Sequence, residues 1–230
     1  MSLAPRVTSC ANASLARVGF VNNPYFIGMA NGAMSLENFR ASQEQFYFAV
    51  RYFARPMAAL ISRMAEPAQR LDLLHNIVEE HGDFRREQFH QNTFRKFLAS
   101  IGGQSPEHAG ITMGPAVHAF NSVLMAASLS DEIAVGVCCL GIVEHAFAGA
   151  SAFIGKTVVE RGWVNASNLA HYALHAELDV RHADEFFAIV EPAWDDAEEQ
   201  AAIRQGLDLG AYAFDQLYRN LIPRRDSADG

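Results

Sequence analysis

Hydrophobic residues recur along the chain with the spacing of α-helices, and no stretch shows the sustained two-residue alternation of a β-strand. Within residues 35–64, for example, Phe46, Val50 and Phe53 follow one another at steps of four and three, so they share one helix face. Ser35 is a suitable N-terminal cap, and Pro56 should kink or split this helix. We predict further helices at residues 66–82, 84–101, 115–130, 131–162, 165–194 and 195–221, with a short helical piece near 105–110.

These elements predict an all-α protein, a bundle of seven to eight helices in which long helices can carry ligands on facing interior positions. With 230 residues, half of them apolar, the chain is large enough to bury a sizeable core. We expect a single domain over residues 21–222, an N-terminal arm at residues 1–20 and a disordered tail at residues 223–230.

The charge and the cysteines narrow the class of protein. A net charge of −8 and a pI near 5.5 provide no basic field for a nucleic acid or an anionic membrane. Cys10, Cys138 and Cys139 form no CxxC pair, which suits a reducing cytoplasm. The most apolar segment, residues 133–150, is interrupted by a Glu-His pair and is a poor membrane span, and the N-terminus lacks the apolar region of a secretion signal. We therefore expect a soluble cytoplasmic protein that acts on a small molecule.

The segment HAELDVRH, residues 175–182, carries the first candidate chemistry. His175, Asp179 and His182 lie at steps of four and three, which places three potential metal ligands on one helix face. Polar residues at this spacing are also typical of a solvated helix face. His171, one turn earlier on the same face, is either a second partner of the site or part of that wet surface. The segment alone leaves both interpretations open.

Glu144 favours the metal interpretation. It lies in CCLGIVEHAFAGA, where nearly every neighbour is apolar, so its helix should be buried. An unpaired buried carboxylate costs several kcal/mol and is retained when it is paired or bound to a metal. A buried salt bridge is the alternative, but no Lys or Arg lies within one turn.

Two further candidates lie upstream, in the segment from residue 76 to residue 90. Glu80 shares a helix face with Leu73 and Ile77, whereas Glu79 is displaced from that face. His90 falls among phenylalanines and is either a ligand or a satisfied core histidine. Glu87, three residues before His90, could chelate with it, although the surrounding run DFRREQ is typical of a solvated surface.

Together these candidates comprise three carboxylates and three imidazoles with no thiolate: Glu80, His90, Glu144, His175, Asp179 and His182. Such a set suits iron or manganese, whereas structural zinc favours cysteine-rich sites. Six protein ligands are too many for one catalytic ion with an open position. They divide between two ions, with one carboxylate bridging.

The order Glu…His, then Glu, then His-x3-Asp-x2-His resembles the haem-oxygenase-like diiron oxidases and oxygenases, whose wider superfamily includes the pyrroloquinoline-quinone synthase and the TenA-type thiaminases. The resemblance covers about residues 22–220 and includes the segments NNPYF, GAMSLENFRASQEQFYFAV, LLHNIVEEHG and HAELDVRHAD. The nearest likeness is to the branch that contains the chlamydial death-domain-associated protein. The resemblance implies a haem-oxygenase-like helical bundle and a homodimer.

The resemblance also implies that the six candidates hold two Fe(II) ions, or manganese, with O2 as co-substrate and no catalytic residue beyond the metal ligands. The implied enzyme is a non-haem diiron oxidoreductase. It would act on a small organic substrate of the amino acid, amine or fatty acid type, by N-oxygenation, C–C cleavage or decarboxylation. The alternatives are a metal-independent enzyme similar to the quinone synthase or the thiaminases, and a non-catalytic binding protein on the same fold.

The sequence departs from the branch that forms para-aminobenzoate, which uses a tyrosine and a lysine of its own chain. Tyr25 and Lys156 are both offset from the corresponding positions, so we do not predict this activity. Tyr25, Arg51 and Lys156 are candidates for a substrate pocket, the two cations as partners of a substrate carboxylate or else as surface charges. The spacing from Glu80 to His90 is longer than in that branch, which leaves Glu79 as an alternative ligand.

Overall fold

The structure, a computed structural model, describes residues 2–222, without the side chains of His108, Ala170 and Glu177. All regular secondary structure in this part of the chain is helical, which confirms the all-α prediction. The α-helices are α1 (Pro5–Val18), α2 (Pro24–Ala30), α3 (Leu36–Tyr52), α4 (Ala54–Arg63), α5 (Pro67–Glu80), α6 (His90–Ser100), α7 (Pro106–Ala109), α8 (Pro115–Leu129), α9 (Ile133–Glu160), α10 (Ala170–Val190) and α11 (Ala197–Asn220). Short 3-10 helices lie at Phe20–Asn22, Gly82–Phe84, Arg86–Gln88, Ala166–Asn168 and Glu191–Ala193.

The described chain has more helices than the seven to eight predicted. The predicted helix at residues 35–64 divides at Phe53 into α3 and α4, three residues before Pro56, because the proline ring cannot be accommodated inside a continuous helix. Helices α1 and α2 lie in a region for which no helix was predicted. The short helix near residue 106 was expected and is α7.

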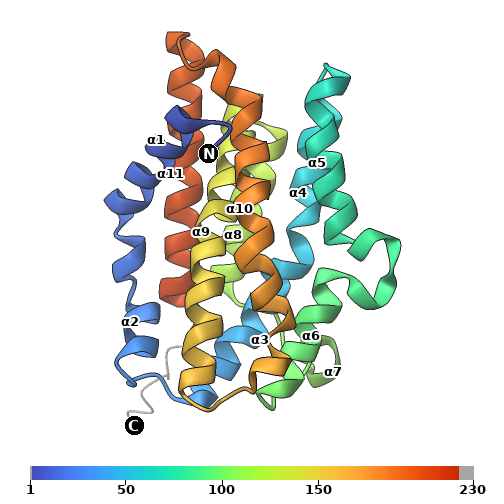
Figure 1. Ribbon diagram of the computed structural model, residues 1–230, viewed down its shortest axis with the longest axis vertical. Helices are drawn as coiled ribbons and strands as arrows, with labels where there is room; N and C mark the ends of the chain where they lie inside the picture. The colour runs from blue at the N-terminus through green and yellow to red at the C-terminus, as the bar shows by residue number, and fades with distance from the viewer. Residues whose placement is uncertain (1, 223–230) are drawn as a thin grey trace.

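Helix α9 is the centre of the bundle, with α10 and α11 along its sides (Figure 1). It also packs against α8 and α4. By length and composition α9 could span a membrane, but 83% of its most apolar window is buried inside the protein. A helix that is apolar on all sides and covered by its own chain is typical of the core of a soluble protein.

Two glycines let α11 approach α9 closely. A Cβ atom at Gly206 would lie 2.4 Å from the carbonyl oxygen of Val135, and one at Gly210 would lie 2.5 Å from that of Cys139. Both distances are far shorter than any real contact, so only glycine fits at either position. The approach fixes the position of α9, which carries Glu144.

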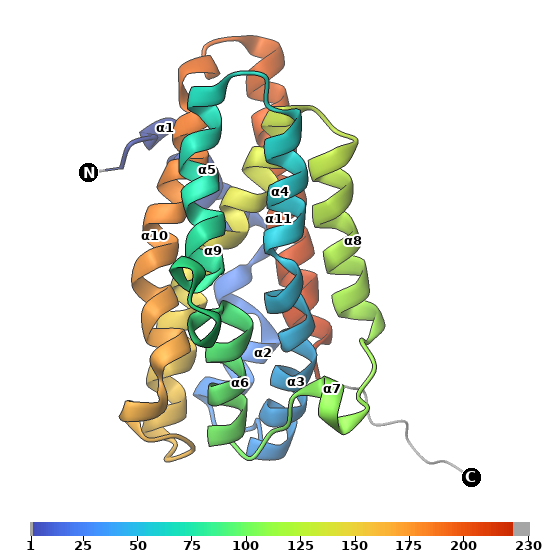
Figure 2. The same cartoon turned by 90° about the vertical axis from the view of Figure 1, so that its right-hand side faces the viewer.

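The segment between α5 and α6 folds back on itself, so the helix predicted over residues 84–101 begins only at His90, as α6 (Figure 2). Gly82, Asp83 and Phe84 all have positive φ, at 55°, 51° and 65°, which is incompatible with a right-handed helix. A Cβ atom at Gly82 would lie 2.5 Å from the backbone of Gln88. The tight reversal brings the end of α5 next to the start of α6.

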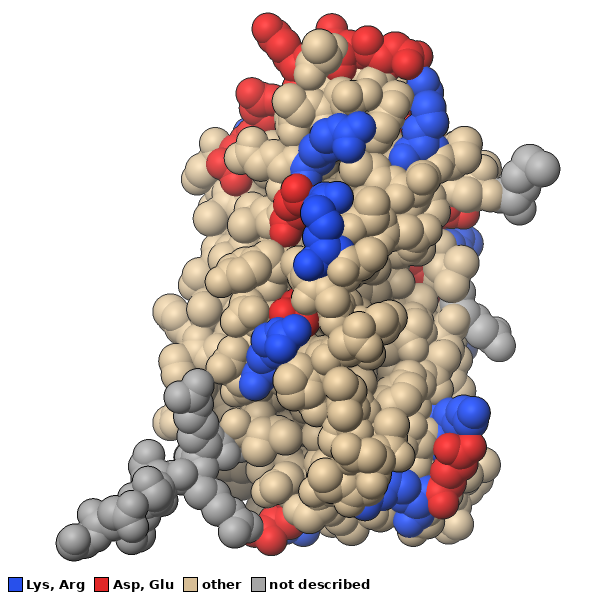
Figure 3. All heavy atoms as spheres, turned by 90° about the vertical axis from the view of Figure 1, so that its left-hand side faces the viewer, with Lys and Arg blue, Asp and Glu red and all other residues tan. Residues whose placement is uncertain are grey.

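Residues 5–18, expected within an N-terminal arm, form helix α1, which packs against α11. Val7 and Ala11 are buried in this contact, and Arg6 pairs with Glu191 at 2.7 Å. Figure 3 shows basic and acidic side chains next to one another on this face, in keeping with the pair formed by Arg17 and Asp208. The expected disordered tail at residues 223–230 lies outside the described residues.

Candidate metal centre

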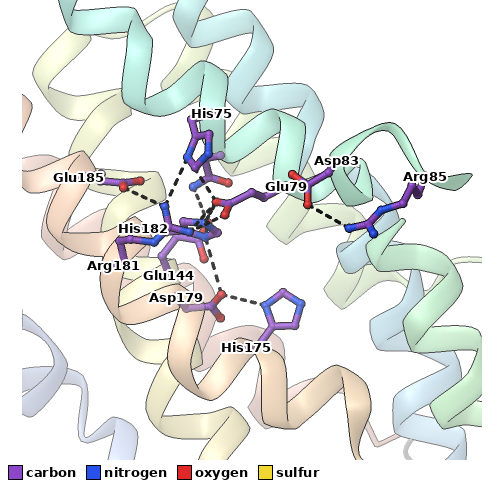
Figure 4. A network of polar contacts seen from close by, with 11 residues as sticks. His75, Glu79, Asp83, Arg85, Glu144, His175, Asp179, Arg181, His182 and Glu185 are labelled. Atoms are coloured by element: carbon purple, nitrogen blue, oxygen red, sulfur yellow. Dashed lines mark hydrogen bonds and ion pairs between the residues drawn. The ribbon is translucent and has the colours of Figure 1, made fainter. Parts of the chain in front are cut away.

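Helices α5, α6, α9 and α10 bring all six predicted ligands to one buried place in the bundle. All six residues are at most 8% exposed. Ionisable groups are buried this deeply only when a hydrogen bond, an ion pair or a metal ion compensates for their lost hydration. Glu80 ends α5, and His90 begins α6. Glu144 lies midway along α9, opposite three residues from one face of α10. Figure 4 shows how the side chains from α9 and α10 converge.

Glu144, Asp179 and His182 form the first of two groups of ligand atoms. One oxygen or nitrogen atom from each lies within 4.8 Å of the other two. His182 Nδ1 is 3.8 Å from Glu144 Oε1 and 3.9 Å from Asp179 Oδ1, distances too long for hydrogen bonds. The three atoms surround a space suited to a cation.

The other three predicted ligands, Glu80, His90 and His175, are taken together as the second group and lie beside the first. His90 Nδ1 lies 2.8 Å from Glu80 Oε1, and the imidazole rings of His90 and His175 have centroids 4.4 Å apart. Asp179 joins the two groups, because its Oδ1 atom is 2.8 Å from His175 Nδ1. All six predicted ligands are therefore next to one another, with Asp179 in contact with His175.

Three atoms of this cluster are buried without a hydrogen-bond partner in the described part of the chain: His175 Nε2, Asp179 Oδ2 and His182 Nδ1. Each such atom costs about 1–3 kcal/mol in a protein interior. All three are oxygen or imidazole nitrogen atoms, which are the donors that iron and manganese accept. Bound cations would satisfy these atoms, so the residues present fit a metal centre.

The pKa shifts of the carboxyl groups in the cluster are also those expected of a site that binds a cation. Burial, together with the charges of Asp179 and Glu80, raises the pKa of Glu144 well above its ordinary value. Burial likewise raises the pKa of Asp179. Burial also opposes ionisation of Glu80, but the contact with His90 outweighs it and leaves the pKa of Glu80 lowered. Burial thus disfavours the ionised forms of Glu144 and Asp179, and a bound cation would favour them.

Glu79 and Glu80, which the sequence could not separate, have different partners. Glu80 contacts His90. Glu79 accepts from Arg181 through both of its oxygens, at 2.6 and 2.7 Å, and lies 2.8 Å from His182 Nε2. A carboxylate that accepts from one imidazole nitrogen fixes the tautomer and turns the other nitrogen toward the metal. Glu79 is thus placed behind His182, away from the space between the ligands (Figure 4).

One further candidate from the sequence lies outside the cluster, and two polar contacts near the ligands were not predicted. Glu87 is exposed, which corrects its role as an alternative ligand. Asn76, one turn before Glu80 on the inward face of α5, donates to Glu144 Oε1 at 3.4 Å. The sequence indicated the inward position of Asn76, because this residue lies four residues before Glu80 on the same helix. The contact of Arg181 with Glu79 had no such signal, because it joins α10 to α5.

A cavity of about 40 Å³ adjoins the cluster and is bounded by Glu80, His90, Glu144, His171 and His175 on its polar side. The remaining wall is apolar and is formed chiefly by Phe46, Phe53, Phe120, Phe147 and Phe214. These side chains come from α3, α8, α9 and α11 and from the junction of α3 with α4. The cavity is large enough for a few small molecules of solvent or gas next to the ligands.

The suggested pocket residues Tyr25, Arg51 and Lys156 do not line this cavity. Tyr25 is buried elsewhere, with its hydroxyl 2.8 Å from Ser42 Oγ and 2.8 Å from Gln43 Nε2. Arg51 pairs with Glu107 at 2.8 Å. The Lys156 side chain is 74% exposed. Their assignment to a pocket is therefore corrected: Arg51 and Lys156 are surface charges, as the alternative interpretation held.

Comparison with known proteins shows relatives in sequence and in fold. The chain is 24% identical over 196 residues to a 4-aminobenzoate synthase of Chlamydia muridarum, a match that covers 84% of this chain and 82% of the relative. Among solved structures, a TenA homologue from Pseudomonas syringae pv. tomato superimposes with a TM-score of 0.74 at 18% identity, covering 96% of this chain and 92% of that one. A CADD-like protein of unknown function from Nostoc punctiforme gives a TM-score of 0.77 at 14% identity, covering 95% and 96%.

A family match covers most of the chain. Residues 40–215 match the family described as iron-containing redox enzymes, a span that includes every residue of the buried cluster. The structural likenesses confirm the haem-oxygenase-like fold. This chain belongs to the haem-oxygenase-like family of iron-containing redox enzymes, and it is an oxidoreductase.

Proposed function

We propose that the protein is a non-haem diiron enzyme that activates O2 to oxidise or oxygenate a small organic substrate. The observation that supports this most directly is a buried cluster of six ligands with three unpartnered atoms, among the described residues, next to an apolar cavity. In this proposal Glu144, Asp179 and His182 hold one ion, Glu80, His90 and His175 hold the other, and Asp179 lies between them. Bound Fe(II) would supply the electrons that reduce O2, and manganese is the alternative metal.

The residues of this chain have separate tasks in that proposal. The ligands are all held by rigid helices, so they would keep their geometry as substrate enters. Glu79 and Arg181 orient His182 from behind. The phenylalanines of the cavity wall would exclude water and so protect a reactive oxidant from loss to solvent.

We propose an external small molecule, of the amino acid, amine or fatty acid type, as the substrate. The chlamydial relative is named a 4-aminobenzoate synthase, but the tyrosine and lysine considered for that chemistry lie outside the cavity here. Tyr25 is enclosed by its hydrogen bonds to Ser42 and Gln43, and Lys156 is in solvent. The proposed reaction is N-oxygenation, C–C cleavage or decarboxylation.

A metal-independent enzyme of the TenA type is the second candidate, since a TenA homologue has the same fold. Such chemistry would require an activated nucleophile. Burial raises the pKa of Cys138 well above its ordinary value and that of Cys139 to about 12, so neither thiol is activated. Neither cysteine lines the cavity beside the cluster.

Anaerobic loading with Fe(II) tests the proposal. We expect about two irons per chain, and a transient visible absorption when O2 is admitted. The His175→Ala variant should lose iron, whereas His145→Ala should retain it, because His145 faces away and bonds to Asn12 at 2.8 Å. Failure of the wild-type protein to bind about two irons, or equal iron content in both variants, would reject the diiron assignment.

We expect the Glu79→Gln variant to bind iron about 10–100-fold more weakly than the wild-type protein. The substitution keeps the size of the side chain but removes the carboxylate that holds the Nε2–H tautomer of His182. Iron affinity is measured by competition with a chelator. Glu185→Gln is the matched control, since Glu185 also bonds to Arg181, at 3.1 Å, yet has no contact with His182 among the described residues. An equal loss of iron affinity in both variants would contradict the role of Glu79 in orienting His182.

We expect iron binding to release protons and to strengthen as pH rises between about pH 5 and pH 8. The raised pKa values of Glu144 and Asp179 mean that the metal-free folded protein keeps protons that the unfolded chain has lost. The stability these groups contribute is present below their unfolded pKa, near 4, and is lost as pH rises through their folded pKa. The lowered pKa of Glu80 has the opposite effect: the stability it contributes is present above its unfolded pKa and is lost as pH falls through its folded pKa.

Proton release can be measured in weakly buffered solution as metal is added, and metal-free stability by urea unfolding across the same pH range. The Glu144→Gln variant should release fewer protons than the wild-type protein. An iron affinity that does not change between about pH 5 and pH 8 would show that the carboxyl groups are already ionised.

A further inference from the structure

We infer that His171 binds the substrate, by accepting a hydrogen bond from a neutral donor on it, such as a hydroxyl or an amine N–H. This inference rests on the proposed function only in taking the cavity beside the metal cluster as the substrate site. It assigns to that cavity a small molecule, or the end of a longer one, that carries a hydrogen-bond donor. The evidence comes from the hydrogen bonds of His171 and from its place in the wall.

Among the described residues, His171 is the one polar residue of the cavity wall that does not belong to the six ligands. It begins the buried face of α10, is 0% exposed, and its ring centroid lies 4.3 Å from that of His175. The Phe94 and Phe147 rings flank it, with centroids 4.8 and 6.5 Å away. A polar ring in such surroundings needs partners for both of its nitrogen atoms.

The tautomer of His171 follows from counting the protons of Thr93. The Thr93 hydroxyl donates to the carbonyl oxygen of His90 at 2.9 Å, because a carbonyl can only accept. A hydroxyl has one proton, so Thr93 Oγ1 must accept from its other neighbour, His171 Nδ1, at 3.1 Å. The proton of the His171 ring is therefore on Nδ1, and Nε2 carries a lone pair.

His171 Nε2 is buried and has no hydrogen-bond partner within residues 2–222. Neither nitrogen of the ring contacts a carboxylate there, since one is bonded to Thr93 and the other is unpartnered, so nothing in its described surroundings favours an imidazolium. A neutral ring with a free lone pair next to an apolar cavity is an acceptor that an incoming molecule can satisfy. A hydroxyl or amine matches it, whereas an ether or a bare hydrocarbon leaves it unsatisfied.

The first test is nuclear magnetic resonance of the metal-free, 15N-histidine-labelled protein. We expect the Nδ1–H tautomer for His171, and methanol should shift the Nε2 resonance whereas dimethyl ether, which has no donor, should not. The Thr93→Val variant should show a mixture of tautomers, and Thr93→Ser should restore the wild-type spectrum. An Nε2–H tautomer in the wild-type protein, or equal shifts with both probes, would overturn the inference.

The second test compares the affinities of the same two probes. The ratio of the methanol affinity to the dimethyl ether affinity should be about five- to tenfold higher for the wild-type protein than for the His171→Phe variant. The variant should keep its full iron content, because His171 is assigned to the substrate and not to the metal. An unchanged ratio of affinities, or a loss of iron equal to that of His175→Ala, would reject the assignment. Both probe measurements use metal-free protein, so they can succeed or fail independently of the diiron proposal.

Discussion

The Asp179→Asn variant should lose stable iron binding and, at the same time, raise the stability of the metal-free protein. Asp179 is 0% exposed, its Oδ2 atom is unpartnered among the described residues, and burial raises its pKa. The variant replaces a carboxylate that contacts both ligand groups, so iron affinity should fall by more than the roughly 10–100-fold expected for the loss of a supporting partner. Removing a carboxyl group that resists ionisation should stabilise the metal-free fold by about 1–3 kcal/mol.

A chelator competition and a thermal melt of the metal-free protein measure the two effects. The expected gain in the stability of the metal-free protein corresponds to a rise of roughly 2–4 °C in Tm for each kcal/mol in a chain of this size. Asp215→Asn is the matched control. Asp215 is also buried, but it accepts from Asn23 at 2.8 Å and from Arg219 at 2.5 Å. Its loss should therefore lower stability and leave iron binding intact. A destabilised metal-free Asp179→Asn variant would contradict the view that function, not stability, retains this carboxylate.

The Gly210→Ala variant should lose about 3 kcal/mol of unfolding free energy, at the upper end of the usual cost of overpacking. The added Cβ atom would meet the carbonyl oxygen of Cys139 and the Ile142 side chain, each at 2.5 Å. Backbone cannot move aside as a flexible side chain can, so α11 and α9 would have to separate. Because α9 carries Glu144, we expect iron affinity to fall as well.

Gly149→Ala is the control for this effect, since Gly149 lies in an exposed part of α9 and a Cβ atom added there would meet no described atom within 4 Å. The same substitution there should stabilise the protein by about 0.5–1 kcal/mol, through the greater helix propensity of alanine. Chemical unfolding of both variants measures the difference. Equal stabilities for the two would show that the close approach of α9 and α11 is not essential.

Much of the candidate metal site could be predicted from local sequence. His175, Asp179 and His182 share one face because the helical period is fixed by backbone geometry. Glu144 was expected to be buried because its neighbours in α9 are apolar, and it is 4% exposed. The inward orientation of Glu80 followed from the apolar stripe of α5. In each of these cases the pattern that allowed the prediction lies within a single helix.

The errors arose where contacts join separate helices. Glu79 was left as an alternative ligand, yet its partners Arg181 and His182 come from α10, about a hundred residues away. The assignment of Arg51 and Lys156 to a pocket relied on sequence position, and both side chains lie in ion pairs at the surface. The helix predicted from residue 84 begins only at His90, because the backbone of Asp83 and Phe84 is left-handed, which their side chains do not indicate.

The sequence by itself determined that the protein is helical and which residues could bind metal, because helical periodicity and the chemistry of side chains are local properties. The tertiary structure alone decided how those residues are divided. It placed Asp179 between two groups of ligands, Glu79 behind His182, and His171 in the wall of an apolar cavity. These relations depend on the distances between helices, which are set by packing such as that of α11 against α9 and not by the residues of any one helix.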